Sequence, residues 1–345
     1  MKSIFNLITV ALILTVSQTF ALGGEFSKTI KKGWLKNGVT ALQITNKFGE
    51  VRINDMGGDS VTIRVKITIE NGSESKAKSL MDKIQINFEK TGTIVMAETS
   101  LEEDFKSNQS FSIDYLVNIP KNRNLEISNK FGNIIVNDLE AKGSFEVSYG
   151  NFTAGKMKAP SGSPISLSVS YGKADIDWIN TAEIEIKYSK FFADEIGQMN
   201  IETKYSTFNI QKIGSAEIES KYDTYNIEEI GKMSAESKYT SYKIGLVTES
   251  FSLETGYGSV RIDKVDPKFK EIEVTNSYGG INIGLGNLNY KLKADCDYCD
   301  IAYPENRFKG NKSKESHKLS IDGSVGTGGG NVSIISRYGG IKLTE

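Results

Sequence analysis

The sequence has 345 residues, a length that allows one or two domains. Its 42 Lys and Arg residues nearly balance 43 Asp and Glu residues, so the overall charge creates no field that would attract nucleic acid or anionic lipid. Glycine (33) far outnumbers proline (5), and 15 tyrosines stand beside 16 phenylalanines, a composition that favours strands joined by turns over helices or disorder.

Residues 1–21 have the layout of a cleavable secretory signal peptide. Lys2 precedes an apolar run over 7–16, and Thr19-Phe20-Ala21 follows, with small residues at 19 and 21 before the expected cleavage near Ala21. The run is too short to span a bilayer and no later stretch is apolar enough, so we expect no transmembrane segment. We therefore expect a secreted protein, located at the outer cell surface or in the periplasm.

Residues 22–127 are predicted to form a β-rich N-terminal capping region. Residues 61–70, 84–89 and 111–120 have the pattern of strands, and 73–84 is typical of one short helix with a serine at its N-cap. The open end of a stack of coils is a template for aggregation. We therefore expect this region to close the first coil.

Residues 128–345 contain an internal repeat. In KYSTFNIQKIGSAEIESKYDTYNI, at 204–227, Tyr205 and Tyr222 lie seventeen residues apart, and Tyr188 and Tyr239 continue the series. A lysine precedes each of these tyrosines, and another aromatic residue follows three positions later. Looser copies of the motif, with glycine after the aromatic residue, occur at Phe48, Phe131, Tyr149, Tyr171, Tyr257, Tyr278 and Tyr338.

A repeat of about 17–22 residues cannot bury its own apolar face and needs copies above and below it. Before each tyrosine, apolar or small residues alternate with polar ones, the period of a strand with one buried face. We therefore predict an all-β fold, a parallel β-solenoid (β-helix-like) with like residues stacked about 4.8 Å apart. Each lap is predicted as a strand, a tight turn, a second short strand and a corner at Gly197, Gly214 or Gly231.

Two aromatic columns and two charged columns follow from this register. We expect the tyrosine and the aromatic residue three positions later both to point into the core, and the glycine after the aromatic residue to supply a corner with positive φ. Outside, a lysine column would run beside a glutamate column of opposite charge, most simply as a solvated face. The columns are Lys187, Lys204, Lys221 and Lys238, and Glu185, Glu202, Glu219 and Glu236.

Cys296 and Cys299 lie in the segment DCDYCD. In an oxidising compartment the pair can form a short-loop disulfide, and the sequence leaves open whether it does. One CxxC lacks the second pair that a closed zinc site needs. Asp295, Asp297 and Asp300 offer oxygen ligands for calcium, but the glycine of a tight calcium loop is absent.

The C-terminal segment contains two turn-rich stretches. Residues 303–318 are polar and are predicted to form a projecting loop or a broken coil, with the single histidine, His317, lacking a recognisable catalytic partner. The glycine-rich residues 326–331 lack the Lys-Ser or Lys-Thr of a phosphate-binding loop, so we expect a tight turn between two strands.

These features together resemble the bacterial putative-adhesin family. The similarity is carried by EFSKTIKKGW at 25–34, by the units NKFGEVRI, NKFGNIIV and NSYGGINI, and by GSVGTGGGNVSIISRYGGIKL near the end. It covers essentially the whole chain after the signal peptide. The resemblance implies a secreted, repeat-built β-solenoid, and it supplies no catalytic residues.

We assign no catalytic, cofactor-binding or metal-binding residue from the sequence. Acidic pairs such as Asp175 and Asp177 would suit a glycan-cleaving site, but a strand-rich chain with 43 acidic residues contains such pairs in any case. We expect a non-enzymatic, adhesin-like scaffold that binds cell-envelope or extracellular polymers, among them glycans, matrix or envelope proteins, and no nucleic acid. The alternative is a carbohydrate-active enzyme, a polysaccharide lyase or hydrolase that uses an exposed solenoid face.

Overall fold

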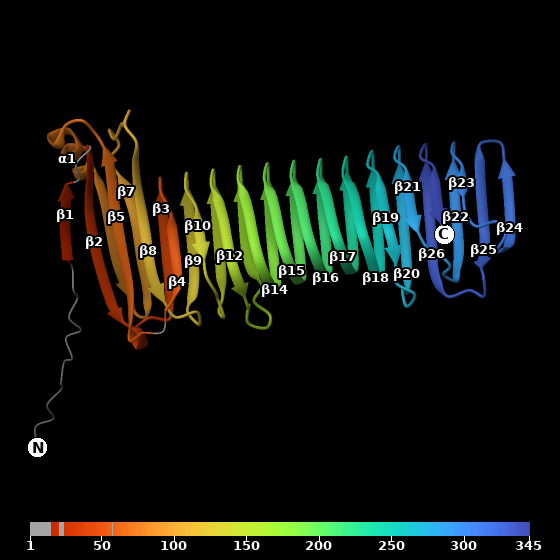
Figure 1. The fold of residues 1–345 in the computed structure, drawn as a ribbon, viewed down its shortest axis with the longest axis horizontal. Coiled ribbons are helices and arrows are strands. Elements are labelled where there is room, and N and C mark those ends of the chain that lie inside the picture. Colours follow the sequence, from red (N-terminus) through yellow and green to blue (C-terminus); the bar gives the residue numbers. More distant parts are fainter. Residues whose placement is uncertain (1–14, 21–23, 57) are drawn as a thin grey trace, which may run out of the picture. The chain divides into compact units, whose positions relative to one another are not determined.

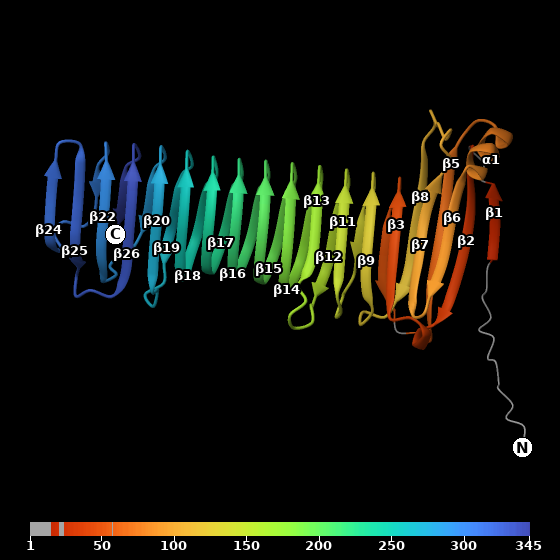
Figure 2. The same cartoon turned by 180° about the vertical axis from the view of Figure 1, so that it is seen from behind.

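The computed structural model describes residues 15–20, 24–56 and 58–345. These residues form 27 strands, one α-helix and a short 3-10 helix, so the all-β prediction is confirmed (Figures 1 and 2). Contacts divide the chain into two units, 1–165 and 166–345. The predicted domain boundary after residue 127 stays a prediction, and the predicted cleavage site at Ala21 lies outside the described residues.

The first unit is built on a mixed sheet. β2, β5 and β8 pair antiparallel, and the alternate residues of β5 from Val61 to Ile69 are fully buried. β6 and β7 form an antiparallel hairpin, whereas β3 and β4 pair parallel with β9 and β10. The strands are β1 (Thr15–Phe20), β2 (Glu25–Leu35), β3 (Ala41–Lys47), β4 (Val51–Asp55), β5 (Ser60–Glu70), β6 (Ile84–Thr91), β7 (Ile94–Leu101), β8 (Phe111–Ile119), β9 (Asn124–Lys130), β10 (Ile134–Val136), β11 (Gly143–Ser148) and β12 (Asn151–Met157).

The predicted helix is present as α1 (Glu74–Asp82), which buries Ala77 and Met81. Ser73 occupies the N-cap position, but its side chain makes no capping hydrogen bond there. The 3-10 helix η1 spans Lys36–Gly38. The predicted strands and the single helix of the N-terminal region are therefore confirmed, while the serine contributes only its backbone geometry.

The second unit is dominated by five long strands that pair parallel in strict order. From β14 to β17 each residue faces the residue seventeen positions later, so Lys187 pairs with Lys204, and Lys204 with Lys221. The expected order of the charged columns is confirmed by this register. The strands are β13 (Ile165–Ser170), which begins at the boundary, β14 (Lys173–Lys187), β15 (Lys190–Lys204), β16 (Thr207–Lys221), β17 (Thr224–Lys238) and β18 (Ser241–Gly256).

The long strands bend at places that the burial pattern reveals. In β15 the alternation of buried and exposed residues is interrupted twice, at Asp194–Glu195 and at Gly197–Gln198, where two exposed residues follow each other. The second interruption contains the predicted glycine corner. A Cβ atom on Gly197 would lie 2.4 Å from the carbonyl oxygen of Asn180, so only glycine lets the neighbouring lap approach this closely.

The end of the second unit departs from sequence order. β26 pairs parallel with both β20 and β22, so the last lap of the chain lies between two earlier laps (Figure 1). β22 and β24 each pair antiparallel with β25, which makes the sheet mixed. The strands are β19 (Val260–Val265), β20 (Glu271–Ser277), β21 (Ile281–Gly284), β22 (Tyr290–Asp297), β23 (Ile301–Ala302), β24 (Phe308–Glu315), β25 (Lys318–Val325), β26 (Gly330–Arg337) and β27 (Ile341–Thr344).

Two predictions for this segment have different outcomes. Of the two alternatives predicted for 303–318, the projecting loop is wrong, because β24 occupies 308–315 and forms a hairpin with β25. The other alternative, a broken coil, agrees with this antiparallel hairpin. Every residue of β24 after Phe308 is exposed and none of them is apolar, so the sequence of this strand has no alternation of apolar and polar residues. The glycine-rich turn is confirmed, since residues 326–329 connect β25 and β26.

One of the two predicted aromatic columns lies in the core. Phe191, Phe208, Tyr225 and Tyr242 are at most 1% exposed, with ring centroids 5.5, 4.4 and 5.1 Å apart in that order. The tyrosine column of Tyr188 and Tyr205 does not point inward, because these side chains are 47% and 43% exposed. The prediction is therefore right for the aromatic residue three positions after each tyrosine and wrong for the tyrosine itself.

Shortening a ring of the buried column tests this assignment. Phe208→Ala leaves a cavity between two stacked laps and is expected to lower the free energy of unfolding by about 3–5 kcal/mol, measured by urea unfolding. Phe208→Leu, which keeps most of the apolar volume, is the matched control and should cost less. A loss within about 0.5 kcal/mol for Phe208→Ala, the range typical of surface changes, would contradict the buried column.

Candidate functional site: an exposed tyrosine ladder

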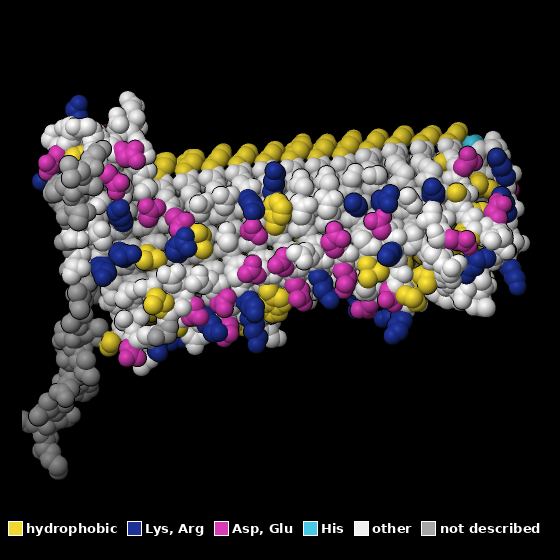
Figure 3. Space-filling model, viewed as in Figure 1, with side chains coloured by type: hydrophobic (Ala, Val, Ile, Leu, Met, Phe, Trp, Pro, Cys, Tyr) yellow, Lys and Arg dark blue, Asp and Glu magenta, His cyan; other side chains and the backbone are white. Residues whose placement is uncertain are grey.

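Nine tyrosines of the second unit form a continuous exposed stack, which we call the tyrosine ladder. Neighbouring ring centroids lie 4.7–5.1 Å apart with interplanar angles of 1–19°. Each side chain is between 43% and 54% exposed, and Figure 3 shows hydrophobic side chains aligned along one edge of this unit. The members in spatial order are Tyr171, Tyr188, Tyr205, Tyr222, Tyr239, Tyr257, Tyr278, Tyr338 and Tyr298.

Every ladder tyrosine has a left-handed backbone conformation. Their φ angles lie between 51° and 62°, a region that non-glycine residues rarely occupy. The prediction that the following glycine supplies the positive φ is therefore wrong, since the aromatic residue itself carries it. The left-handed residue breaks the alternation of the strand, so Lys187 and Tyr188 both face outward and Ser189 turns inward.

The first unit contains the same corner. Phe48, Phe131 and Tyr149 have φ angles of 63°, 60° and 56° and stack in that order at 5.1 and 5.2 Å. Phe131 and Tyr149 are 43% and 50% exposed. An aromatic residue in left-handed conformation, stacked on its equivalents, is thus a property of the repeat in both units.

The residue after each aromatic is small because it enters a crowded interior corner. A Cβ atom on Gly258 would lie 1.8 Å from the carbonyl oxygen of Thr240, so glycine is required there by close approach. In the regular laps the position is polar and its side chain accepts a backbone hydrogen bond from the previous lap. The Ser189 N–H donates to Ser206 Oγ at 3.2 Å, and the Ser206 N–H to Asp223 Oδ1 at 2.6 Å.

Asp223 is the one carboxylate of this buried corner column. Its side chain is 3% exposed, and its Oδ2 accepts hydrogen bonds from Ser220 Oγ at 2.7 Å and from the Lys221 N–H at 3.0 Å. Burial raises the pKa of the carboxyl above its ordinary value of 3.8, and the hydrogen bonds from Ser220, Ser206 and Lys221 offset part of that rise.

Stacking and backbone strain in the ladder are of similar size. An aromatic pair contributes about 0.5–1.5 kcal/mol beyond the area that it buries. A non-glycine residue in left-handed conformation costs about 1–2 kcal/mol. An interior ladder tyrosine with two neighbours therefore gains little net stability from its position. Stacking thus roughly offsets the strain, and a strained conformation that recurs at exposed positions motivates a functional hypothesis for this surface.

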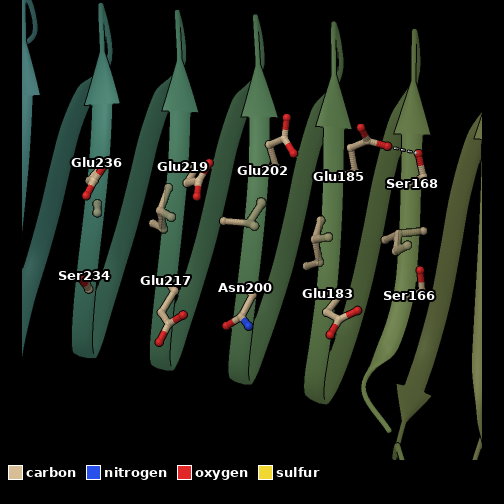
Figure 4. A pocket seen from close by; sticks show the side chains of 15 residues that line it. Ser166, Ser168, Glu183, Glu185, Asn200, Glu202, Glu217, Glu219, Ser234 and Glu236 are labelled. Atoms are coloured by element: carbon tan, nitrogen blue, oxygen red, sulfur yellow. Dashed lines mark hydrogen bonds between the residues drawn. The ribbon is translucent and has the colours of Figure 1, made fainter.

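A shallow groove of about 660 Å³ lies beside the ladder on the same strands (Figure 4). Two columns of polar side chains line it, separated by buried apolar residues such as Ile201. Ser168 Oγ donates a hydrogen bond to Glu185 at 3.0 Å, and the groove also contains the amide of Asn200. The polar lining consists of Ser166, Ser168, Glu183, Glu185, Asn200, Glu202, Glu217, Glu219, Ser234 and Glu236.

The lysine column separates this groove from the ladder. Lys187 forms an ion pair with Glu185, and Lys204 Nζ lies 5.2 Å from the ring centroid of Tyr205. Both contacts involve exposed or half-exposed groups, so they contribute little to stability. The face therefore presents a line of aromatic edges, a line of ammonium groups and a polar groove in parallel.

The far end of the ladder brings together residues that the sequence left unassigned. His317 stacks on Tyr298 at 4.1 Å, and its Nε2 lies 3.1 Å from Asp297 Oδ1. Arg337 Nε donates to the other oxygen of Asp297 at 3.0 Å. Cys296 and Cys299 form a disulfide around the same corner. These neighbours of His317 were not apparent from the sequence, because they depend on β25, which begins next to the histidine and places it against Tyr298 and Asp297.

The acidic residues considered for chemistry are dispersed. Asp175 is paired with Lys173 at 2.6 Å on the same strand, and Asp177 is exposed two residues further on. Asp295 accepts a hydrogen bond from Ser320 Oγ at 2.5 Å. Across the described ranges, no three His, Cys, Asp or Glu residues are arranged to hold a metal ion.

No helix within the described ranges is long and apolar enough to cross a membrane.

No family model and no curated protein matches the chain. Among solved structures, a putative cell adhesion protein from Clostridium sporogenes is 11% identical, with 92% of this chain and 99% of that chain covered and a TM-score of 0.22. Putative adhesins from Parabacteroides merdae and Parabacteroides distasonis are 14% and 11% identical. Both cover 73% of this chain, with 95% and 96% of theirs and TM-scores of 0.38 and 0.36. These similarities are too low to indicate what this chain binds.

The left-handed conformation of the ladder predicts an unusual order of stabilities. At position 205, Tyr205→Gly is expected to be more stable than Tyr205→Ala by about 1–2 kcal/mol, because glycine carries no left-handed penalty. At Glu219, an exposed position inside β16, the order should reverse, with alanine better by about 0.5–1 kcal/mol. Urea unfolding of the four variants gives both differences. The same order at both positions would refute the strained corner.

The buried carboxyl predicts a dependence of stability on pH. Because the pKa of Asp223 is higher in the folded than in the unfolded chain, the folded state binds more protons above pH 3.8. Its contribution is therefore most favourable below pH 3.8 and is lost as the pH rises through the raised pKa.

Asp223→Ser copies the hydroxyl of the neighbouring laps and removes this titration. The difference in the free energy of unfolding, variant minus parent, should be larger at pH 7 than at pH 4, because only the parent protein loses stability as the carboxyl ionises. Urea unfolding at both pH values measures this difference. Ser206→Ala, which has no titrating group, is the control for loss of a corner side chain. A difference for Asp223→Ser that does not change with pH would contradict the raised pKa.

Proposed function

We propose that this chain is a secreted, non-enzymatic, adhesin-like scaffold that binds cell-envelope or extracellular polymers along the tyrosine ladder and its groove. The observation that carries the proposal is the ladder itself, nine exposed aromatic rings held in a strained conformation. The proposed location, the outer cell surface or the periplasm of a bacterium, is supported by the signal-like pattern of residues 1–21.

The proposed architecture is a parallel β-solenoid. It is supported by the strand register, in which Tyr225 of one lap pairs with Tyr242 of the next and with Phe208 of the previous one. The register of seventeen residues and the buried aromatic column are what a chain winding in stacked laps requires. The antiparallel strands β24 and β25 then act as a cover at the C-terminal end of the second unit.

A polymer is the partner that the site favours. Small ligands bind in concave pockets that enclose most of their surface, whereas the ladder runs along an edge of the unit (Figure 3) and the groove is shallow. The same chemical groups recur at each lap, about 4.8 Å apart. A partner with its own repeat can contact several rungs at once, so that weak contacts add up through multivalency. Ring edges, lysines and groove hydroxyl and amide groups offer apolar and hydrogen-bonding contacts to glycans or to extended protein segments.

Replacing several tyrosines of the ladder tests the proposal. We expect the triple substitution of Tyr188, Tyr205 and Tyr222 by glycine to weaken binding at least about tenfold, a loss of about 1.4 kcal/mol. Binding is measured by pull-down and interferometry against purified peptidoglycan, neutral and acidic polysaccharides, and matrix proteins. The glycine changes suit the left-handed corner, so the fold should be retained.

The control changes a different exposed column of the same laps, Asp194, Gln211 and Glu228, to alanine. Equal binding by the ladder variant and this control would overturn the role of the ladder. Absence of binding to every polymer would overturn the adhesin-like function. Turnover of a polysaccharide that Asp175→Asn or Asp177→Asn abolishes would establish the alternative, a carbohydrate-active enzyme.

A further inference from the structure

The tyrosine ladder places oxidisable phenols in contact along its whole length. Tyr205 and Tyr222 have ring centroids 4.7 Å apart with an interplanar angle of 9°, and Tyr222 and Tyr239 follow at 4.8 Å. Each side chain is about half exposed, so each phenol is in reach of water and of an external oxidant.

We propose that the ladder is a site of oxidative modification, at which a peroxide-driven oxidant couples tyrosines of adjacent laps into dityrosine. The inference is independent of what polymer the face binds. The product would be a covalent cross-link between tyrosines one lap apart, for example between Tyr205 and Tyr222.

The coupling balances with a peroxide as the oxidant. Each of two phenols gives up one electron and one proton and becomes a phenoxyl radical. The radicals join through ring carbons next to the phenol oxygens, and each of these carbons passes its proton to the oxygen, which restores both aromatic rings. The peroxide accepts the two electrons and two protons and leaves as two molecules of water. A haem peroxidase is the class of enzyme that delivers these single-electron steps.

The geometry suits coupling within one chain. The ring centres are already at contact distance, and the strand register holds the two corners one lap apart. The rings must turn from face-to-face toward edge-to-edge, and exposed side chains reorient on a picosecond to nanosecond timescale. Because the exposed edge of each ring faces solvent, this rotation meets no packed neighbour on that side. The phenolic protons can leave directly to water.

A buried pair in the same laps provides an internal control. Tyr225 and Tyr242 stack at 5.1 Å with an angle of 10°, nearly the geometry of the ladder, but are 0% and 1% exposed. Burial raises the pKa of both hydroxyls, which opposes loss of the proton. An oxidant in solution cannot reach these rings. The proposal therefore requires coupling at the ladder and none at this pair.

The test uses the folded full chain with a haem peroxidase and hydrogen peroxide, followed by dityrosine fluorescence and mass spectrometry of cross-linked peptides. In the parent protein we expect within-chain cross-links between ladder neighbours, at a yield that does not change with protein concentration. Their absence, cross-links found only between chains, or equal cross-linking of Tyr225 with Tyr242 would each overturn the proposal.

Two matched variants test whether cross-linking requires two tyrosines in neighbouring laps or only two exposed tyrosines. Both retain two ladder tyrosines and change the other seven, together with Tyr149, to phenylalanine, which Phe48 and Phe131 show the corner accepts. One variant retains Tyr205 and Tyr222, and the other Tyr205 and Tyr239, two laps apart. We expect the within-chain cross-link in the first and its loss to background in the second. Equal yields in two folded variants, verified by circular dichroism, would overturn the role of the stacked geometry.

Discussion

Parallel pairing of equivalent residues one lap apart is the constraint on which the second unit depends. Strands lie about 4.8 Å apart, so each side chain has its own equivalent as its nearest neighbour above and below. Apolar residues gain from this arrangement, as the buried column through Phe208 shows, whereas like charges repel and must stay in water. The carboxyl of Asp223 is an exception, since it is buried. It is stabilised there by hydrogen bonds, among them one that it accepts from the backbone N–H of Ser206 in the lap before it.

The left-handed corner determines which aromatic column becomes surface. Strand alternation alone would send Tyr205 inward, in phase with Thr203, which is buried. A positive φ at Tyr205 shifts the phase by one residue, so the ring stays outside and Ser206 enters the core. That inner position has little room, which accounts for the glycine, serine, aspartate, threonine or cysteine found there. The exposed ladder and the small corner residue are therefore two results of one backbone conformation.

Binding and oxidative coupling draw on the same property of the ladder, its regular spacing. A repeating partner meets the same contact at every lap, and a phenol in the stack meets another phenol at contact distance. The two need not coincide, because binding uses the outward edges of the rings and coupling joins rings within the stack. At the far end, His317 and the disulfide between Cys296 and Cys299 lie at the final rung, so the ladder ends in a corner that is closed covalently.

The sequence by itself determined the lap length, the identity of the columns and their neighbours, because a repeat of seventeen residues with period-two patterning needs in-register copies. It also indicated the strands and the helix of the first unit, whose apolar alternation is strong. Only the tertiary structure decided the direction of the tyrosines, the insertion of β26 between β20 and β22, and the strand at 308–315. These depend on a backbone φ at Tyr188 and its equivalents, on pairing between distant segments, and on β24 having a partner in β25, none of which leaves a periodic signal in the residues themselves.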